Sequence, residues 1–408
     1  MRRKPDYLLL GSTIALLVLG TLMVYSASFV VAHNEFADDA YFLTRQLIYV
    51  GIGGVMLLVG MSLDYHRWRS LSVLVMLICI GLLVAVILPG VGFRSYGASR
   101  WLRLGSVVQI QPSELAKIGI VLYLSDWLAR RGSLVGDFKR GLLPFAIIVA
   151  LVAGLVVIQP DLGTTSIIIG AAACVFFVAG ANLLHVGLML SGGVAAGLFV
   201  LSRLSGYRQD RIAAFLDPWS DIQGSGWHTA QGLIALGSGG PLGRGLGESF
   251  QKFYWVPNAH TDAIFAIIGE ELGFVGSLGL LVLFGLLAWR GFRIAFRAPD
   301  AFGRLYATGL TCMLVLQAIV NIAVVTNSVP YTGVTLPLVS FGGSSTVISL
   351  LAVGLLLNIS RHTAASTPKS EQLARPAANP VAPSSPRARQ HALAIRTRAT
   401  ARRQKVYG

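Results

Sequence analysis

Five carboxylates interrupt strongly apolar stretches of the sequence and are the first candidates for chemistry: Asp262, Glu270, Glu271, Glu114 and Asp161. A charge at the centre of a bilayer costs about 2.5–3.5 kcal/mol, so a carboxylate in such a sequence needs a partner or a task. A positioned carboxylate can act as a general base, which removes a proton from a hydroxyl as its oxygen attacks. Acid–base chemistry is therefore the first activity to consider.

Asp262 stands where a long polar connection ends and an apolar helix is predicted to begin. That position suits a catalytic base at a membrane surface. It also suits a helix cap, because a side-chain oxygen there accepts hydrogen bonds from free backbone N–H groups and favours the helix dipole. Glu270 and Glu271 lie about 12 Å further along the same helix, and we expect them to form hydrogen bonds inside the bundle.

Glu114 and Lys117 are one helical turn apart, which places both side chains on one helix face. Two interpretations stay open for them. They form either a self-neutralising structural pair or part of a substrate site.

The connection 91–113 carries Arg94, Arg100 and Arg103 and no acidic residue. Arginine binds phosphate through two parallel hydrogen bonds and stays charged in a low dielectric. Trp101 beside Arg100 adds an aromatic ring. The connection therefore predicts contact with lipid headgroups or with an anionic ligand.

The glycine-rich run 237–247 resembles a phosphate-binding loop only superficially. It lacks the Lys-Ser/Thr ending of a P-loop and follows no clear strand. We reject a nucleotide site and expect a backbone that packs tightly against a substrate or a partner.

Composition identifies the surroundings in which these residues act. The chain is 54% hydrophobic and 12% charged, with a mean hydropathy of +0.68, whereas soluble domains carry about 25% charged residues. The net charge of +15 does not indicate nucleic acid, because the basic residues gather at the ends of apolar runs and after Arg361. Cys79, Cys174 and Cys312 lie in apolar runs without metal-ligand or disulfide spacing. We predict an integral membrane protein.

Ten apolar stretches are candidate membrane spans, although several are shorter than the roughly 20 residues that a span needs. They are Leu8–Val30, Leu47–Leu63, Leu71–Leu88, Leu115–Leu128, Leu142–Ile158, Thr164–Val178, Val186–Leu201, Ala263–Trp289, Leu305–Val325 and Val339–Ile359. The first is too long for a signal peptide and is read as a membrane helix. The sequence thus predicts an all-α, polytopic fold of about ten transmembrane helices.

Basic residues predict the orientation, because positive charge gathers on the cytoplasmic side. With both termini cytoplasmic, one side receives Arg2, Arg3, Lys4, Arg67, Arg69, Arg130, Arg131, Lys139, Arg140, Arg290, Arg293, Arg297 and Arg304. The half-apolar segment 202–261 becomes a large extracytoplasmic loop between helices 7 and 8. Residues 1–360 form the membrane domain, and 361–408 form a disordered, basic cytoplasmic tail that contacts membrane lipid.

Seven motifs together resemble the SEDS family (shape, elongation, division and sporulation) of FtsW/RodA type. They are Gln111–Lys117, Gln159–Thr164, Gly206–Ile212, Asp217–Trp219, His260–Asp262, Ile268–Gly273 and Leu336–Ser345. The resemblance runs from the first span to about Ile359, and the segment 237–252 is closer to the FtsW-like branch than to the RodA-like one. The sequence does not decide between division and elongation.

This resemblance implies a peptidoglycan glycosyltransferase that polymerises lipid II at the outer face of the bacterial cytoplasmic membrane. It implies partners as well: a class B penicillin-binding protein that supplies the transpeptidase, and other divisome or elongasome membrane proteins. The family's essential acidic residue falls on Asp262. The expected substrate-binding residues are Arg100, Trp101, Arg103, Gln111, Ser113, Glu114, Lys117, Arg208, Arg211, Lys252, His260, Thr261 and Ser344. One departure is Tyr96-Gly97-Ala98-Ser99-Arg100-Trp101, where the family's first Arg is Ser99.

The implied mechanism is an inverting single displacement. Asp262 takes the proton of a sugar 4-hydroxyl, whose oxygen attacks the anomeric carbon of a second lipid-linked glycan and forms a β-1,4 bond. No cofactor or dedicated metal site is expected, although Mg²⁺ or Mn²⁺ near the diphosphate would assist. Two alternatives stay open: a flippase that transports lipid II, and a non-catalytic scaffold for a transpeptidase.

Overall fold

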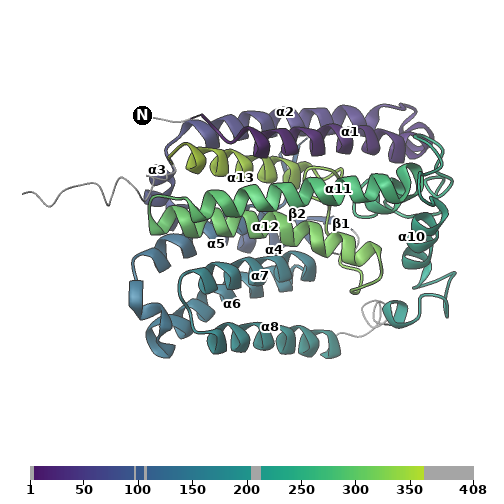
Figure 1. Cartoon of the computed structure of the whole chain (residues 1–408). Coiled ribbons are helices and arrows are strands. Elements are labelled where there is room, and N and C mark those ends of the chain that lie inside the picture. The colour runs from purple at the N-terminus through teal and green to yellow at the C-terminus, as the bar shows by residue number, and fades with distance from the viewer. Residues whose placement is uncertain (1–3, 96–97, 105–107, 204–212, 363–408) are drawn as a thin grey trace, which may run out of the picture. The chain divides into compact units, whose positions relative to one another are not determined.

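The structure is a computed structural model that describes residues 4–95, 98–104, 108–203 and 213–362, and it is a bundle of helices (Figure 1). In the first half of the chain the helices are α1 Tyr7–Phe36, α2 Tyr41–Ser62, α3 Tyr65–Ser70, α4 Ser72–Ile87, α5 Pro112–Ala129, α6 Leu143–Ile158 and α7 Leu162–Val178. The later ones are α8 Leu183–Arg203, α10 Trp227–Ser238, α11 Ile264–Phe296, α12 Ala301–Val325 and α13 Gly343–His362. A 3₁₀ turn, Gly132–Gly136, and a π turn, Phe138–Leu142, precede α6.

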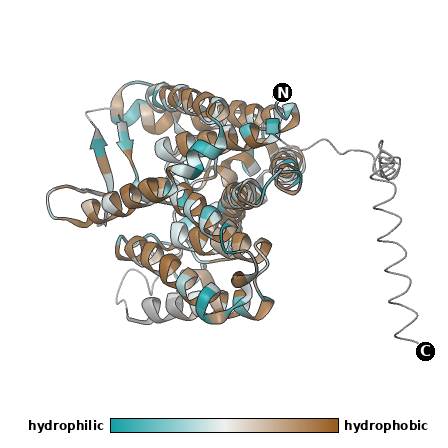
Figure 2. Cartoon of the chain, turned by 90° about the vertical axis from the view of Figure 1, so that its left-hand side faces the viewer, coloured by the Kyte–Doolittle hydropathy of each residue, from teal (hydrophilic) through white to brown (hydrophobic). Residues whose placement is uncertain are grey.

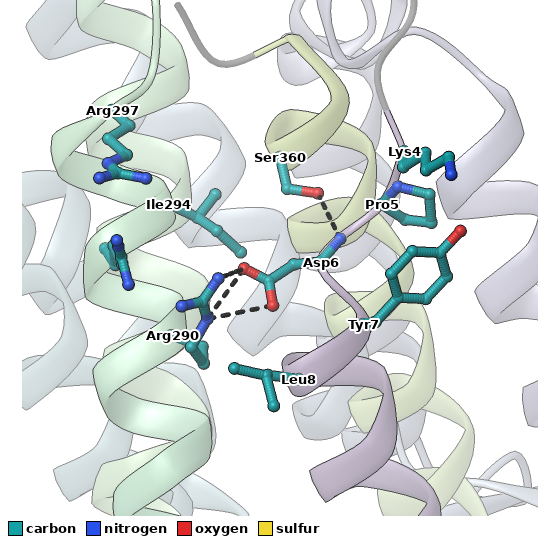
Figure 3. Close-up of a pocket in the computed structure, with 10 residues that line it drawn as sticks. Lys4, Pro5, Asp6, Tyr7, Leu8, Arg290, Ile294, Arg297 and Ser360 are labelled. Carbon is teal, nitrogen blue, oxygen red and sulfur yellow. Dashed lines mark hydrogen bonds and ion pairs between the residues drawn. The ribbon is translucent and has the colours of Figure 1, made fainter. Parts of the chain in front are cut away.

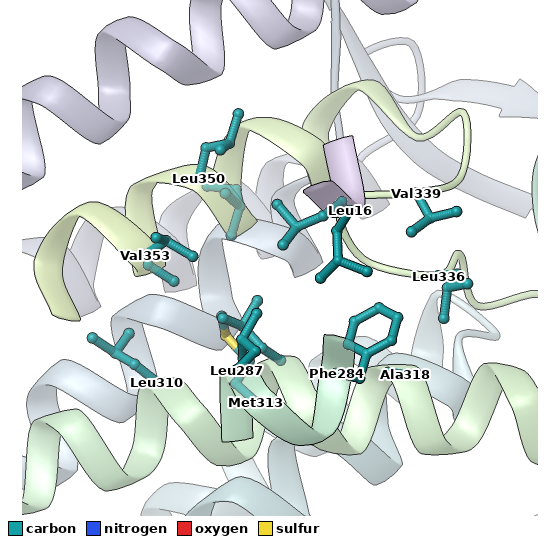
Figure 4. Close-up of a cluster of buried hydrophobic side chains, with 14 of the residues drawn as sticks. Leu16, Phe284, Leu287, Leu310, Met313, Ala318, Leu336, Val339, Leu350 and Val353 are labelled. Carbon is teal, nitrogen blue, oxygen red and sulfur yellow. The ribbon is translucent and has the colours of Figure 1, made fainter. Parts of the chain in front are cut away.

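α13 lies at the centre of the bundle. In its most apolar stretch of 18 residues, 94% of the residues are buried. α13 packs against α2, α1 and α12. Glycine permits the closest approach, because a Cβ on Gly354 would lie 2.3 Å from the carbonyl oxygen of Leu57. Figure 4 shows the apolar cluster between α13, α11 and α12, which includes Leu350, Leu287 and Met313.

Each predicted span overlaps one helix of the structure. Within the described residues, six helices are long and apolar enough to cross a membrane: α1, α2, the Phe138–Ile158 stretch that ends in α6, α11, α12 and α13. Many large apolar side chains are exposed, and hydrophobic residues predominate along the helices (Figure 2). The chain is therefore a multi-pass membrane protein, while the count of ten crossing helices stays a prediction. Of the predicted tail, Arg361 and His362 are the last residues of α13, and residues 363–408 lie outside the described part of the chain.

The arginine-rich connection differs from the all-α prediction, because it forms a small antiparallel sheet. β1 (Phe93–Ser95), β2 (Ala98–Leu104) and β3 (Val108–Ile110) pair in the order β1-β2-β3, with Phe93 opposite Trp101 and Leu102 opposite Ile110. The alternation Leu102-Arg103-Leu104 is the period-two pattern of a half-buried strand. Elements this short give little signal in a mostly apolar chain.

Part of the connection between α8 and α11 packs onto α11. The segment 232–236 belongs to α10, which packs on α11. The glycine-rich run packs on the backbone of α11 itself, where Gly243 has φ +80° and a Cβ would lie 2.2 Å from the carbonyl oxygen of Glu271. α11 is broken opposite this run, at Gly273 (φ 65°, ψ −163°). The tight backbone thus serves a contact within the chain.

We predict that Gly273→Ala destabilises the protein by about 1–3 kcal/mol, because only glycine adopts this backbone conformation without strain. A Cβ there would also lie 2.2 Å from the backbone nitrogen of Gly243. Thermal unfolding of the purified protein measures the effect. Gly279→Ala on the same helix is the matched control, since a Cβ there has nothing within 4 Å, and an equal loss in both variants would contradict the prediction.

Candidate functional site

A cavity of about 1340 Å³ lies at the N-terminal end of α11. Its walls come from the start of α2, the β1–β2 hairpin, α10, and the loops that precede α11 and α13. The sequence candidates Asp262, Thr261, Arg100 and Trp101 line this one cavity. Arg100 and Asp262, 162 positions apart in the sequence, therefore share a single site.

Asp262 is buried, with 6% of the residue exposed, yet it lines the cavity. It is not a helix cap: the N-cap of α11 is Ala263, which makes no side-chain cap hydrogen bond. Its Oδ1 accepts a hydrogen bond from Thr261 Oγ1 at 3.1 Å, and its Oδ2 accepts one from the hydroxyl of Tyr331. Its carboxylate is thus held by neighbouring hydroxyls at the cavity wall, and the cap interpretation is wrong.

Asn321 on α12 fixes the backbone around Asp262. Its side-chain amide donates to the carbonyl oxygens of Asp262 at 2.8 Å and Val334 at 2.7 Å. Asn321 is buried, and its bonds join the start of α11 to the loop before α13. The ring of His228 from α10 packs on Tyr331 at 4.3 Å between centroids. Four segments therefore hold the Asp262 carboxylate in place.

Arg100 supplies positive charge on the wall formed by β2. Its Nε donates to the carbonyl oxygen of Gln159 at 2.8 Å, and its Nη2 donates to that of Pro160 at 2.5 Å. Arg45 from α2 lines the same cavity, with its guanidinium 4.4 Å from the centroid of the Tyr41 ring. Two cations and several aromatic rings thus share the cavity with Asp262, a composition that suits an anionic ligand with sugar rings or an apolar tail.

Gln111 and Ser113 do not line the cavity but support the segment that anchors Arg100. Both donate to Oδ2 of buried Asp161, at 3.1 and 3.3 Å, while Asp161 caps α7 through Thr164 N. Ser344 bridges to the same region, since it accepts a hydrogen bond from Gln111 N and donates to the carbonyl oxygen of Gln109. Their predicted contact with substrate stays a prediction.

Glu114 and Lys117 form a buried ion pair of 2.8 Å in which each residue is at most 5% exposed. Lys117 Nζ also donates to Gln317 Oε1 at 2.5 Å. Gln317 in turn donates to the carbonyl oxygen of Thr335, a residue of the cavity wall, at 3.0 Å. The pair therefore lies behind the cavity and is linked to its wall through Gln317.

Lys252 is paired in the same way. Its Nζ lies 3.0 Å from Glu271 Oε1, and both side chains are fully buried. Ser26 of α1 donates to the Glu271 carboxylate at 2.7 Å. Glu270 accepts hydrogen bonds from Ser249 and from backbone N–H groups of the same loop. The predicted interior role of the two glutamates is confirmed, and Lys252 shares it.

His260 is wedged between aromatic rings, with its centroid 4.2 Å from that of Phe42 and 5.6 Å from that of Phe341. Burial lowers the pKa of His260 to about 4. Arg103 is exposed and stacks on Phe93, a residue of the cavity wall, at 3.4 Å from the ring centroid. Arg208 and Arg211 lie outside the described residues.

Tyr331, Asn321, Arg45 and His228 were missed by the sequence analysis. Tyr331 follows Pro330 and precedes Gly333 in a polar break between two apolar stretches, which is the one signal that could have drawn attention to it. Asn321 lies within an apolar run, and such a polar residue needs a partner. The sequence does not tell which partner it has.

Known proteins resemble this chain over nearly the whole described region. The family model described as cell cycle protein, for FtsW, RodA and SpoVE, matches residues 7–365. Stage V sporulation protein E of Bacillus subtilis is 44% identical over 363 residues, which is 89% of this chain and 98% of that protein. The probable peptidoglycan glycosyltransferase FtsW of Trichlorobacter lovleyi is 43% identical over 366 residues, or 88% of this chain and 95% of that protein.

A solved structure shares the fold. One chain of a peptidoglycan synthase complex that coordinates polymerization and crosslinking superposes with a TM-score of 0.69 and 32% identity. The match covers 88% of this chain and 98% of that one. The similarity thus extends from the sequence to the arrangement of the helices.

Removal of Lys117 is expected to destabilise the protein, because Glu114 would keep a buried, unpaired charge. Lys117→Met should lower the free energy of unfolding by about 3–5 kcal/mol, measured as a lower melting temperature of the purified protein. The double variant Glu114→Gln/Lys117→Met removes both charges and should recover part of the loss. Wild-type stability in the single variant would contradict this structural role.

Acidification is expected to destabilise the protein partly through His260. Its folded-state pKa of about 4 lies below the usual 6.5, so the stability that its neutral form contributes is present above pH 6.5 and lost as the pH falls toward 4. His260→Gln should therefore lose less melting temperature than wild type between pH 7.5 and 4.5. Equal losses of melting temperature in wild type and His260→Gln would refute the assignment.

Proposed function

The chain belongs to the FtsW, RodA and SpoVE family of cell cycle proteins, and from that premise we propose the reaction that the Asp262 cavity performs. The protein is a peptidoglycan glycosyltransferase of cell-wall synthesis. We assign the polymerisation of lipid II into β-1,4 glycan strands to this cavity. The observation that carries the assignment is Asp262, a buried carboxylate that faces the same space as Arg45 and Arg100.

Asp262 acts as the general base in this proposal. An acceptor sugar places its 4-hydroxyl against the carboxylate, which takes the proton as the oxygen attacks the anomeric carbon of the donor. The bond to undecaprenyl diphosphate breaks, and the α link becomes a β link. One base suffices for such a single displacement. The hydrogen bonds from Tyr331 and Thr261 hold the carboxylate in one orientation, as near-attack geometry requires.

Arg100 and Arg45 stabilise the negative charge that grows on the departing diphosphate. Arg100 is suited to this task because two backbone carbonyl oxygens already fix its guanidinium, and preorganised charge does not reorganise during the reaction. Trp101 and Trp227 line the same cavity and provide flat apolar surfaces against which sugar rings pack. Arg103 extends this charged surface at the rim.

A divalent cation fits this donor set only together with substrate. Among the described residues no three His, Cys, Asp or Glu side chains gather in a metal-binding cluster. Two carboxylates, Asp221 and Asp262, line the cavity, and Mg²⁺ is commonly held by one or two carboxylates and substrate phosphates. Bound there, Mg²⁺ or Mn²⁺ would neutralise charge on the diphosphate.

The membrane topology belongs to the same proposal. We place both termini in the cytoplasm, the cavity at the outer face of the cytoplasmic membrane, and ten helices across it. The charge distribution along the sequence supports this orientation. The similar chain in the peptidoglycan synthase complex supports a class B penicillin-binding protein as partner, with other divisome or elongasome proteins around the pair.

Polymerisation of lipid II tests the proposal directly. Purified protein is combined with its penicillin-binding protein made transferase-silent, and wild type is compared with Asp262→Asn. The variant should be slower by about a hundredfold or more. Asp39→Asn, an exposed carboxylate that does not line the cavity, is the matched control. Equal polymer from wild type and Asp262→Asn would refute the role of Asp262; none from either would favour transport or scaffolding.

Tyr331→Phe is expected to lower kcat by about tenfold to a hundredfold, because the Asp262 carboxylate loses the hydrogen bond that orients it. KM and melting temperature should change little, since the ring and its packing on His228 stay in place. Tyr41→Phe removes a hydroxyl elsewhere on the cavity wall and should keep wild-type kcat. A kcat unchanged in Tyr331→Phe would show that this hydrogen bond has no part in the reaction.

A further inference from the structure

A second pocket lies at the opposite end of α11, where that helix meets the start of α1 and the end of α13 (Figure 3). Its volume is about 360 Å³. Its charged lining residues are Lys4, Asp6, Arg290, Arg293 and Arg297. Four cations and one carboxylate leave an excess of three positive charges, and the proposed reaction uses none of them.

One ion pair gives this pocket a fixed frame. Arg290 Nε donates to both carboxylate oxygens of Asp6, at 3.0 and 2.9 Å, and its Nη2 bonds the same group. The Asp6 carboxylate also caps α1 by accepting a hydrogen bond from Leu9 N, and the Asp6 backbone N–H donates to Ser360 Oγ of α13 at 3.2 Å. Asp6 therefore joins the ends of α1, α11 and α13, and its carboxylate neutralises the charge of Arg290.

The remaining cations have no such partner. Across the described parts of the chain, no carboxylate lies within 4.0 Å of the charged groups of Lys4, Arg293 or Arg297. The sequence after His362 adds little compensation, since it holds nine Lys or Arg residues and one acidic residue, Glu371. A concentration of cations on rigid helix ends attracts an anion from outside the chain.

The position of the pocket indicates where that anion comes from. The part of α11 after its break at Gly273, from Phe274 to Phe296, spans about 35 Å, more than the roughly 30 Å of a bilayer's hydrocarbon core. If its N-terminal end reaches one membrane surface, its C-terminal end reaches the other. The pocket thus lies at headgroup level, on the side that the basic residues predict to be cytoplasmic.

Apolar side chains next to the pocket distinguish a lipid from a soluble anion. Leu8 is 52% exposed, Trp289 is 54% exposed and Phe296 is 75% exposed. Leu8 itself lines the pocket, and the Arg290 guanidinium lies 5.1 Å from the centroid of the Trp289 ring. Tryptophan is enriched at membrane interfaces, and exposed apolar side chains offer a path for acyl chains.

We propose that this pocket binds the phosphate of an anionic phospholipid headgroup. Arg293 and Arg297 are four residues apart on α11 and so present two guanidinium groups on one helix face, where each can bind phosphate oxygens through two parallel hydrogen bonds. Lys4 adds a third cation from the other side of the pocket. Basic pockets between membrane helices on the cytoplasmic side bind such headgroups. The bound lipid ties α1 to α11 next to the Asp6–Arg290 pair.

Lipid binding to the full-length protein tests the proposal. Native mass spectrometry counts phosphatidylglycerol and phosphatidylcholine molecules retained by wild type, by Arg293→Gln/Arg297→Gln, and by Arg67→Gln/Arg304→Gln. The last variant removes two exposed arginines outside the pocket and is matched in charge. Melting temperatures in phosphatidylcholine should agree for all three proteins, because none of the four arginines is in an ion pair with a described carboxylate. A parallel titration uses glycerol 1-phosphate, which has the phosphate but no acyl chains.

Wild type and the Arg67/Arg304 variant should retain one phosphatidylglycerol preferentially, and the Arg293/Arg297 variant should bind it about thirtyfold more weakly. Phosphatidylglycerol should raise the melting temperature of wild type and of the Arg67/Arg304 variant, but not that of the Arg293/Arg297 variant. Equal retention by all three proteins, or no preference over phosphatidylcholine, would overturn the proposal. Glycerol 1-phosphate that competes at the same concentration as the lipid would assign the site to a soluble phosphate and would likewise overturn it.

Discussion

The need of buried charges for ion-pair or hydrogen-bond partners inside an apolar bundle is the constraint that determines where the polar residues of this protein lie. An ion removed from water keeps its stability only if an opposite charge and hydrogen bonds replace the water. Lys117 meets Glu114, Lys252 meets Glu271, and Arg290 meets Asp6, each between segments distant in sequence or along one helix turn. The Arg290–Asp6 pair joins α11 to α1, the Lys252–Glu271 pair joins α11 to the loop that covers it, and the Glu114–Lys117 pair lies within α5 behind the cavity.

Asp262 satisfies the same constraint differently. No cation is paired with it among the described residues; hydroxyl groups of Tyr331 and Thr261 hold it instead, at the edge of a large cavity. A carboxylate that is oriented by neutral donors and faces a cavity stays available to a proton from substrate. Its surroundings separate it from Glu270 and Glu271, whose oxygens are occupied by the loop that covers α11. The geometry thus distinguishes three nearby carboxylates that the sequence presents as similar.

Hydropathy located ten helices of the described residues, because each apolar stretch is long compared with the errors at its ends, but it did not locate α3 and α10. It could not reveal the sheet of β1–β3, whose strands are three to seven residues long. The motif residues were identified from sequence, but their separate roles were not. Arg100 lines the cavity, whereas Gln111 binds Asp161 next to the segment that holds Arg100. Tyr331 and Asn321 act through contacts between distant segments, and a single sequence contains no record of such contacts.

The central claim is that Asp262 performs a chemical step in a cavity that binds substrate without it. Single-turnover experiments on Asp262→Asn in nanodiscs, with lipid II binding measured on the same samples, test this claim most directly. We expect Asp262→Asn to bind lipid II with wild-type affinity and to transfer no glycan within the lifetime of a wild-type turnover. Transfer at the wild-type rate would contradict the assignment, and loss of binding would make Asp262 a substrate-binding residue instead of the base.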